Sequence, residues 1–258
     1  MVMVAPPGVQ ERRYALAQAM RALTVGGRLT VLAHKERGGA RIAKELVGFG
    51  CTVQEESKRH QRICRSTRPI YVTGIEELIL VGGIQVPPAL GLWSQPGIFS
   101  WDRPDPGTLG LIGHLPQLSG DGADFGCGAG LLSRAILQSQ AVTRLCLVDI
   151  DRRAIGAAKL NVVDPRAVFA WRDLRWDVPE TRNLDFVVMN PPFHDGGSED
   201  RSLGEAFVRS ASTSLKPGGV CWLVANRHLP YEKPLASSFS AIRLIDQAAG
   251  YKIYKAIR

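Results

Sequence analysis

Hydrophobic and polar positions follow two different periods along the second half of the chain. Short apolar runs, bounded by Gly, Pro or Asp, are typical of buried strands, and segments with apolar residues every three to four positions are typical of helices. The runs predict strands at 144–150, 167–171, 184–189 and 220–225, preceded by a short strand that ends in the sequence FGCGAG. The other segments predict helices at 131–138, 153–162 and 205–215.

Strands that alternate with helices indicate right-handed crossovers and therefore a mostly parallel sheet covered on both faces. The last part of the chain breaks this alternation. Residues 242–247 and 251–256 are two strand-like runs separated by the sequence AAG. We therefore expect a terminal β-hairpin on the edge of the sheet, in a protein of the α/β class.

The first part of the chain predicts a smaller α/β piece. Its pattern favours helices at 11–23 and 40–49 and strands at 28–33, 52–55 and 70–73. A Gly- and Pro-rich stretch follows at 82–113, which is typical of a linker or wrapping loop. We expect two domains, an N-terminal one at 1–80 and a larger one at 81–258.

Composition excludes several classes of protein. Hydrophobic residues make up 45% and charged residues 22% of the 258 positions, as in an ordinary globular protein with a sizeable core. No apolar run approaches the roughly 20 residues that cross a bilayer, and the N-terminus does not resemble a signal peptide. We expect a cytoplasmic protein without a membrane partner.

The chain carries a formal charge of +8. Between Lys35 and Arg68 it has nine Lys or Arg residues against four Glu. Such an excess is consistent with a solvated surface, and equally with a surface that binds a polyanion such as RNA. Within this segment we select Arg59, Arg62 and Arg65 as candidate RNA contacts.

The five cysteines are scattered and form no CxxC or Cys/His cluster. This pattern favours reduced thiols, and it gives no indication of a metal site.

A glycine-rich turn follows the first strand of the large domain. It reads Asp124-Phe-Gly126-Cys-Gly128-Ala-Gly130, and Asp149 ends the next strand 19 residues after Gly130. Glycines allow a tight turn and a close approach of the backbone to a ligand, although such a turn can also be purely structural. A carboxylate at the end of the next strand can accept hydrogen bonds from both hydroxyls of a ribose. Asp151 is the alternative acceptor.

The end of the third predicted strand offers Asp173, which could accept a hydrogen bond from the amino group of an adenine or could simply cap a helix. These features together favour a nucleoside cofactor.

The most specific motif is Asn190-Pro191-Pro192-Phe193, followed by His194. Two prolines cannot continue a central strand, so the chain must leave the sheet rigidly at its carboxyl edge, where open α/β sheets bind ligands. The Asn190 amide oxygen and the following carbonyl can accept both hydrogens of an exocyclic amino group, and Phe193 can stack on a planar base. His194 either contacts the substrate or only occupies its position.

With these motifs the chain resembles class I S-adenosylmethionine-dependent methyltransferases that act on exocyclic amino nitrogens. PGIFSWDRPDPGT, DFGCGAGLLS, NPPFHDGG and VANRHLPYEKPL are similar to segments of the bacterial small-subunit (16S) ribosomal RNA guanine-N2 methyltransferases. The resemblance runs from about residue 95 to the C-terminus. It implies a Rossmann-like, seven-stranded, mostly parallel sheet, and an N-terminal domain that is a degenerate copy of the same fold and helps to hold RNA. The basic piece at 1–80 resembles part of that domain but is shorter than in the family.

The resemblance also implies roles for individual residues. S-adenosylmethionine is the expected cofactor, with contacts at Asp124, Gly126, Gly128, Gly130, Asp149, Asp173, Phe99 and Thr108. Phe99 and Thr108 are expected to close over its methionine end. The expected partner is ribosomal RNA or the small ribosomal subunit, with no metal.

Three hypotheses follow for the function. The first is methyl transfer to guanine N2 in small-subunit ribosomal RNA. The second keeps the chemistry but changes the acceptor to adenine N6 or a protein glutamine. The third is a non-catalytic RNA-binding assembly factor. Intact Asn190 and Phe193 argue against the third, and the basic N-terminal piece argues against the second.

Overall fold

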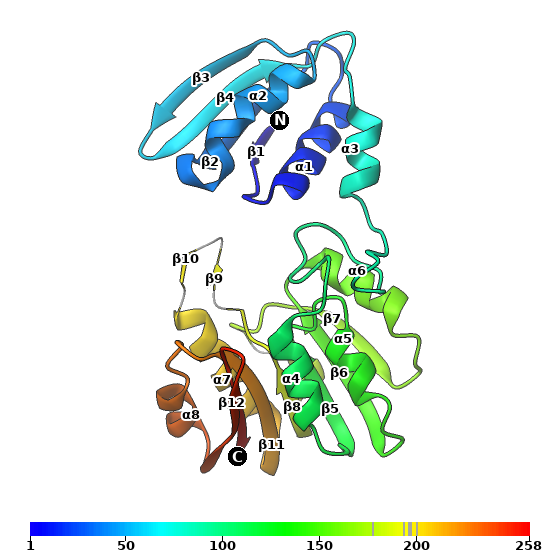
Figure 1. Ribbon diagram of the computed structural model, residues 1–258, viewed down its shortest axis with the longest axis vertical. Helices are drawn as coiled ribbons and strands as arrows, with labels where there is room; N and C mark the ends of the chain where they lie inside the picture. Colours follow the sequence, from blue (N-terminus) through cyan, green and yellow to red (C-terminus); the bar gives the residue numbers. More distant parts are fainter. Residues whose placement is uncertain (177, 193, 196–197, 200) are drawn as a thin grey trace. The chain divides into compact units, whose positions relative to one another are not determined.

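The structure is a computed structural model that describes residues 1–176, 178–192, 194–195, 198–199 and 201–258. The chain forms two compact units, Met1–Ile84 and Gln85–Arg258 (Figure 1). The division lies four residues beyond the expected position of 80, because a helix of the first unit continues to Gly82. No helix among the described residues is long and apolar enough to cross a membrane.

The first unit is a four-stranded sheet with three helices. The strand order is β1-β2-β4-β3, in which β1 and β2 are parallel and the other pairs are antiparallel. In chain order its elements are β1 (Val2–Val4), α1 (Val9–Ala22), β2 (Arg28–His34), the kinked turn η1 (Lys35–Gly39), α2 (Ala40–Gly48), β3 (Val53–Lys58), β4 (Gln61–Thr67) and α3 (Ile75–Gly82).

The core of the first unit lies between its sheet and its helices. Leu16 and Met20 of α1 and Ile42 and Leu46 of α2 pack there against apolar strand residues. A buried ion pair connects the two helices: the fully buried Arg12 guanidinium donates to Glu45 at 2.7 and 2.9 Å. Because the carboxylate neutralises the guanidinium, this pair can lie in the core without an uncompensated charge.

The second unit is a seven-stranded, mostly parallel sheet with a C-terminal antiparallel hairpin, as the sequence predicts. The strand order is β12-β13-β11-β8-β5-β6-β7. The parallel strands are β5 (Gly120–Phe125), β6 (Val142–Asp149), β7 (Ala167–Trp171), β8 (Leu184–Met189) and β11 (Leu215–Asn226). The hairpin consists of β12 (Ala241–Ala248) and β13 (Tyr251–Ile257), and β13 pairs antiparallel with β11.

Both faces of this sheet are covered (Figure 1). Alternate residues of the central strands enter two separate core clusters, as the period of two in a strand requires. One face carries α7 (Arg201–Ser214) and α8 (Glu232–Ser238), and the other carries α4 (Pro106–His114), α5 (Leu131–Ile136) and α6 (Arg152–Asn161). The short 3₁₀ turn η2 (Pro179–Thr181) precedes β8. After β8, the two-residue strands β9 (His194–Asp195) and β10 (Ser198–Glu199) pair with each other.

The register of the central strands brings three loops together. Phe125, the last residue of β5, lies beside Val148 of β6 and Met189 of β8. Strand β6, which follows β5 in the chain, lies on one side of β5, and β8 lies on its other side. The strand order therefore reverses at the end of β5. Open α/β sheets bind ligands at the carboxyl ends of strands at such a point.

The strands of the first unit differ from the sequence prediction. Residues 70–73 form no strand: Ile70 and Tyr71 are 71% and 86% exposed and follow Pro69, so they have no sheet to join. Two strands are missing from the prediction: the three-residue β1, and β4, whose basic residues hid its alternation. Only Cys64 and Ser66 of β4 are buried, and they alternate with exposed positions.

The Gly- and Pro-rich stretch at 82–113 is not entirely a loop. Its last part forms α4, which begins at a side-chain cap from Asp105 with Pro106 in the first turn. Its glycines disguised the helix, and Leu111 supplies the buried side chain that holds it on the sheet. The helices α3 and α8 were also absent from the sequence prediction.

Candidate cofactor and acceptor-amine site

The glycine-rich turn lies directly after β5. Gly126, Gly128 and Gly130 have φ angles of +72°, +52° and +87°. At Gly128 an added Cβ would meet no atom within 4 Å, so this face of the turn opens onto free space. A side chain there would be strained by the positive φ and would occupy the space that a ligand needs.

Asp149 closes β6 beside this turn. Its carboxylate accepts hydrogen bonds from the backbone N–H groups of Gly128 (2.9 Å) and Asp151 (2.8 Å). Burial nevertheless raises the pKa of Asp149, because desolvation disfavours the charged form. The two amides fix the carboxylate at the edge of the cavity, where its remaining acceptor positions are available to a hydroxyl-bearing ligand.

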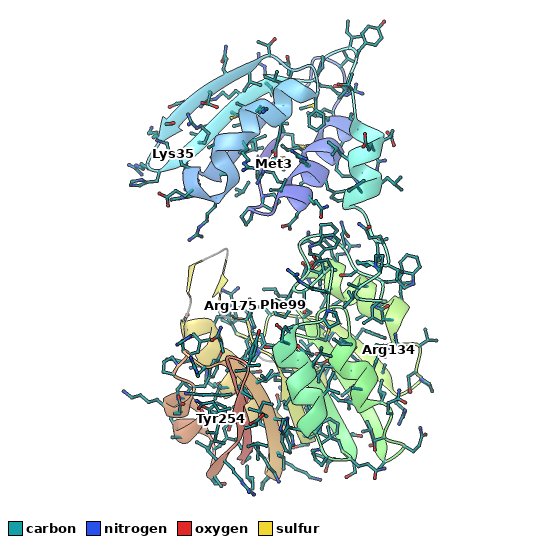
Figure 2. The ribbon with its side chains drawn as sticks, viewed as in Figure 1. Met3, Lys35, Phe99, Arg134, Arg175 and Tyr254 are labelled. Carbon is teal, nitrogen blue, oxygen red and sulfur yellow. The ribbon has the colours of Figure 1, made fainter. Side chains whose placement is uncertain are left out.

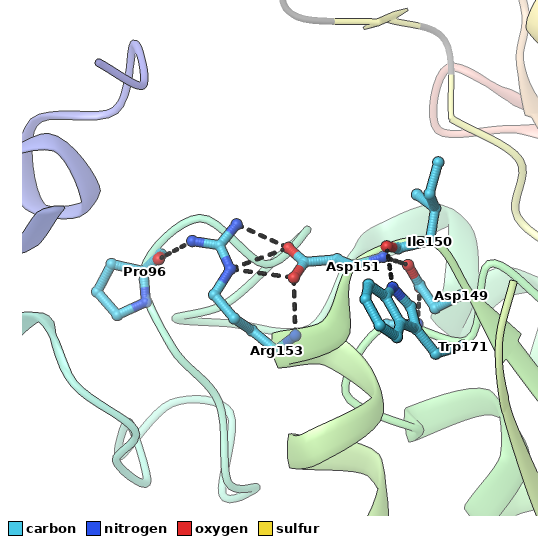
Figure 3. Close-up of polar contacts among 7 residues, drawn as sticks. Pro96, Asp149, Ile150, Asp151, Arg153 and Trp171 are labelled. Carbon is cyan, nitrogen blue, oxygen red and sulfur yellow. Dashed lines mark hydrogen bonds and ion pairs between the residues drawn. The ribbon is translucent and has the colours of Figure 1, made fainter. Parts of the chain in front are cut away.

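Asp151 has a different role from Asp149 (Figure 3). It caps α6 by accepting from the Arg153 N–H at 2.8 Å, and it forms an ion pair with the Arg153 guanidinium at 2.7 Å. Its carboxylate is therefore committed to helix α6, which leaves Asp149 as the better acceptor for a ribose. Beside it, the Trp171 indole N–H donates to the Ile150 carbonyl at 2.8 Å and fixes the end of β7.

Asp173 lies two residues beyond β7 and lines the cavity. Both of its carboxylate oxygens are bound by Arg175, with the shortest contact at 2.7 Å, and this ion pair lowers the pKa of Asp173. The sequence suggested a carboxylate that was free to meet an adenine. The Arg175 contact instead makes Asp173 and Arg175 a paired unit at the rim.

Asn190 follows the last residue of β8. Its side-chain Nδ2 donates to Asp105 Oδ2 at 2.9 Å and to Thr108 Oγ1 at 2.8 Å. Since both contacts use the NH₂ end of the amide, the carbonyl oxygen Oδ1 is the end available to a ligand. Pro191 is buried and Pro192 exposed, so the chain turns away from the sheet at this point.

Two further predicted site residues, Phe193 and His194, follow the prolines. Phe193 lies outside the described residues. The backbone of His194 begins the short strand β9, which pairs with β10.

Asn190 lies where two adjoining cavities meet. The larger has a volume of about 330 Å³ and is lined by Gly126, Gly128, Asp149, Asp173 and Asn190, among others. The smaller, of about 50 Å³, shares Phe99, Gly126, Gly128 and Asn190 with it and adds Asp105, Thr108 and Asp124. Phe99 and Arg175, both labelled in Figure 2, are far apart in the sequence and line the same larger cavity.

Asp124 is the acidic group of the smaller cavity. It is only 1% exposed and accepts a hydrogen bond from the Ser133 hydroxyl at 2.5 Å. Burial raises the pKa of Asp124 to about 7, and the nearby Asp149 carboxylate adds to the increase. A buried carboxylate of this kind is stabilised in its charged form by a cationic ligand group.

Thr108 has a different surrounding from the one expected. Its hydroxyl bonds to Asp105 and Asn190, so it contacts the acceptor-binding amide, although it still borders the smaller cavity. Sequence reasoning gave Asp105 no role. The dipeptide Asp-Pro at the start of a helix is the signal that could have identified it as a cap.

The candidate RNA contacts lie on the β3–β4 hairpin of the first unit. Arg62 pairs with Glu55 at 2.6 Å and Arg65 pairs with Glu56 at 2.8 Å, so the charges of both are largely neutralised. Arg59 is in the turn between the strands, with a φ of +47°, and forms no ion pair with any residue that the structure describes.

A second basic feature of this unit is a cavity of about 630 Å³ between α1 and α2. Arg13, Arg41, Lys44 and Glu45 line it. The Glu45 carboxylate is already bound bidentately by the buried Arg12. Arg13 also pairs with Glu45, at 3.5 Å. Within the described chain, Arg41 and Lys44 form no ion pair.

The second unit thus combines a parallel sheet, an antiparallel β13 inserted between β12 and β11, and a cofactor-sized cavity at the point where the strand order reverses. This combination defines the class I S-adenosylmethionine-dependent methyltransferases. The methyltransferase small domain family matches residues 89–255. The chain belongs to this family, in the group of the ribosomal RNA small subunit methyltransferase C proteins.

Two similar proteins from Shewanella species support this assignment. The chain is 32% identical to the ribosomal RNA small subunit methyltransferase C of Shewanella loihica over 252 residues, which cover 93% of this chain and 72% of that protein. It is 36% identical to the protein of the same name from Shewanella pealeana over 165 residues, 63% of this chain. In that second alignment the chain spans about half (48%) of its relative's length.

One solved structure has a similar fold over the whole chain. It is the T. thermophilus 16S rRNA N2 G1207 methyltransferase in complex with AdoMet and guanosine, with a TM-score of 0.83 and 27% identity. The match covers 100% of this chain and 72% of that one. The family, the fold class and the S-adenosylmethionine cofactor predicted from the sequence are therefore confirmed.

Proposed function

We propose that the protein transfers the methyl group of S-adenosylmethionine to the exocyclic N2 of a guanine in small-subunit ribosomal RNA. The observation that carries this proposal is the orientation of Asn190, whose Nδ2 is bound by Asp105 and Thr108 so that Oδ1 is left to accept from an amino group. The T. thermophilus relative with guanosine and AdoMet supports guanine as the base.

The acceptor side of the site works by alignment. The lone pair of a guanine amino group is delocalised into the ring and is a poor nucleophile. Hydrogen bonds from its two N–H groups to Asn190 Oδ1 and the Pro191 carbonyl favour the pyramidal geometry in which this lone pair can attack. Phe193 stacks on the base, which must be unpaired or flipped to enter. The amine loses its proton to solvent after transfer, so His194 acts at most as a substrate contact.

The cofactor side binds through the loops after β5 and β6. S-adenosylmethionine supplies a methyl group that is already activated by its sulfonium. Asp149 accepts the ribose hydroxyls, and the Gly126–Gly130 turn allows the close backbone approach. Asp173, held by Arg175, lies at the adenine, and Phe99 covers the methionine end next to Asp124. Proximity and orientation contribute most of the rate enhancement.

Asp124 makes cofactor binding dependent on pH. Its pKa of about 7 in the free protein falls when the cationic amino group of the cofactor approaches, because an opposite charge favours the ionised form. Below pH 7 binding should therefore release a proton. Calorimetry at pH 6.5 in buffers of different ionisation enthalpy should detect this release, and the Asp124→Asn variant should not show it. Equal proton release by the variant would contradict the role of Asp124.

Two other hypotheses from the sequence can be compared with this proposal. Adenine N6 or a glutamine amide would use the same Asn190 pocket. The basic cavity of the first unit, together with Arg59 at its hairpin turn, favours a polyanionic substrate over a protein. A non-catalytic assembly factor would have no need for the Asn190 network or the open space at Gly128.

The first unit supplies affinity for RNA phosphates in this proposal. This unit acts as the shortened, degenerate methyltransferase-like domain. The substrate of the whole protein is ribosomal RNA or the small ribosomal subunit in the cytoplasm. Arg41 and Lys44 at the cavity, together with Arg59 at the hairpin turn, are the better phosphate contacts. Arg62 and Arg65 contribute less, because Glu55 and Glu56 neutralise them.

The salt dependence of RNA binding tests this division. Log affinity falls as log salt rises, and each lost phosphate contact makes this slope less steep by about 0.7–0.9 units. Arg41→Gln with Lys44→Gln should reduce its steepness by ~1.5 units, whereas Arg62→Gln with Arg65→Gln should reduce it by less than ~0.5 units. Cofactor binding should be unchanged in both double variants, since its residues belong to Gln85–Arg258. Equal slopes for the two double variants would show that the ion pairs do not decide which cations meet RNA.

The acceptor is tested by comparing ribosomal RNA from cells with and without the gene. Mass mapping of modified nucleosides should show the loss of one N2-methylguanosine. An unchanged RNA accompanied by altered protein methylation would overturn the proposal.

A further inference from the structure

The start of helix α4 holds a buried aspartate whose role no sequence motif indicates. Asp105 is 8% exposed, and its Oδ2 accepts from the Thr108 N–H at 2.8 Å and the Thr108 hydroxyl at 3.2 Å. The same oxygen accepts from Asn190 Nδ2 at 2.9 Å, from a residue 85 positions away. One carboxylate oxygen therefore both caps a helix and binds the amide of the proposed acceptor site.

This contact selects one of the two orientations of the Asn190 amide. A carboxylate can only accept hydrogen bonds, so the end of the amide that faces Asp105 must be its NH₂ group. Rotation by 180° would bring Oδ1 against the negative charge of Asp105 and would turn the NH₂ group toward the cavity. An amide in that orientation would meet an incoming amino group donor to donor.

The other oxygen of Asp105 is held from the far end of the chain. The Tyr251 hydroxyl, from β13, donates to Asp105 Oδ1 at 3.2 Å. A Cβ at residue 107 would lie 2.5 Å from the Tyr251 ring, so Gly107 is what allows the ring to lie on the first turn of α4. Burial, and then the Asp105 carboxylate, raise the pKa of Tyr251, which keeps its hydroxyl protonated as a donor.

We propose that Asp105 is a positioning residue that orients the Asn190 amide, with Oδ1 toward the acceptor amine, and that Tyr251 holds Asp105 in place for this. The inference rests on the proposed function, because it assigns Asn190 the acceptor role described there. Asp105 itself does not contact the reacting atoms. Its contribution should therefore appear in the rate of methyl transfer and not in the affinity for the cofactor.

Substitutions of Asp105 separate this role from helix capping. Asp105→Ser keeps a side-chain cap for α4 but is too short to reach Asn190 in the same way. Asp105→Asn keeps an oxygen toward Asn190 and Thr108, because its NH₂ group can donate to the Tyr251 hydroxyl instead. The same exchange at the half-buried Asp102, three positions earlier, is the matched control.

The single-turnover rate and the cofactor affinity should be measured for each variant. We expect Asp105→Ser to lower the rate about 10- to 100-fold, as for the loss of an orienting partner, with cofactor Kd within about threefold of the wild type. Asp105→Asn should recover most of the rate, and Asp102→Ser should leave it unchanged. A wild-type rate for Asp105→Ser would overturn the proposal. The proposal would also be overturned if the rates of the Ser and Asn variants fell only in proportion to the decrease in their melting temperatures.

Hydrogen exchange of the Asn190 side-chain NH₂ protons, followed by NMR, reads the same contact without any RNA. These protons should be protected in the wild type and in Asp105→Asn, and should exchange faster in Asp105→Ser. Identical exchange in all three would overturn the positioning role. If the wild type shows this protection but methylates no RNA, the proposed function fails while the role of Asp105 in orienting the amide stands.

Discussion

Replacement of Asn190 by alanine is expected to lower the rate of methyl transfer by about 100- to 1,000-fold. The amide oxygen is the group that meets the amine in the transition state, and removal of one such aligned hydrogen-bonding group costs this much in other enzymes. Cofactor Kd should change by less than about threefold, since Asn190 contacts the acceptor and not the cofactor. Single-turnover methyl transfer and calorimetry measure the two quantities separately.

Asn226→Ala is a suitable control for this variant. Asn226 ends β11, the strand next to β8, as Asn190 follows β8, but it does not line either cavity. It should keep the wild-type rate. An Asn190→Ala variant that transfers methyl groups as fast as Asn226→Ala would remove Asn190 from the catalytic role.

Replacement of Asp149 by alanine should have the second largest effect, on cofactor affinity. The ribose hydroxyls would lose their charged acceptor, and the Gly128 N–H would lose its hydrogen bond. Losses of this kind cost about 1–3 kcal/mol, which corresponds to a roughly 5- to 150-fold increase in cofactor Kd. Calorimetric titration with S-adenosylmethionine measures it.

Asp164→Ala provides the matched loss of a carboxylate. Like Asp149, Asp164 accepts a hydrogen bond from a backbone N–H. It also pairs with Arg166, and it does not border either cavity. Its replacement should leave cofactor Kd unchanged. If both variants bind the cofactor as the wild type does, Asp149 is not the ribose acceptor.

The sheet of the second unit could be predicted from the sequence because its central strands, such as β8, are buried on both faces. The runs at 167–171 and 184–189 coincide with β7 and β8, and the terminal hairpin has the predicted place at the sheet edge. Continuous apolar runs bounded by Gly, Pro and Asp give a strong signal for such strands. The glycine turn, Asp149 and Asn190 follow these strand ends directly, so their convergence could be expected.

The first unit and helix α4 were harder to predict for physical reasons. Strand β3 is almost entirely exposed and β4 is rich in arginine, so neither has the apolar pattern of a buried strand. Helix α4 contains Gly107, which lowers its helix propensity but is required beneath the Tyr251 ring. A contact between residues 105 and 251 depends on tertiary packing, and no local pattern records it.

Ion pairing was the other property that the sequence concealed. Arg62 and Arg65 come seven and nine positions after Glu55 and Glu56, a spacing that becomes a cross-strand contact only when the β3–β4 hairpin forms. The same holds for Glu45, which the fold pairs with Arg12. A count of charges along a segment therefore overestimates the number of cations available to RNA.

The central claim is that this site methylates guanine N2 in small-subunit ribosomal RNA. The most direct test is to incubate the protein and small-subunit ribosomal RNA, free or in assembled subunits, with S-adenosylmethionine that carries a deuterated methyl group. The RNA is then digested to nucleosides, which are separated by chromatography and identified by mass. The account predicts that the label appears in N2-methylguanosine with the wild type and is nearly absent with Asn190→Ala. Label in N6-methyladenosine or in ribosomal protein, or no label in either form of the RNA, would contradict it.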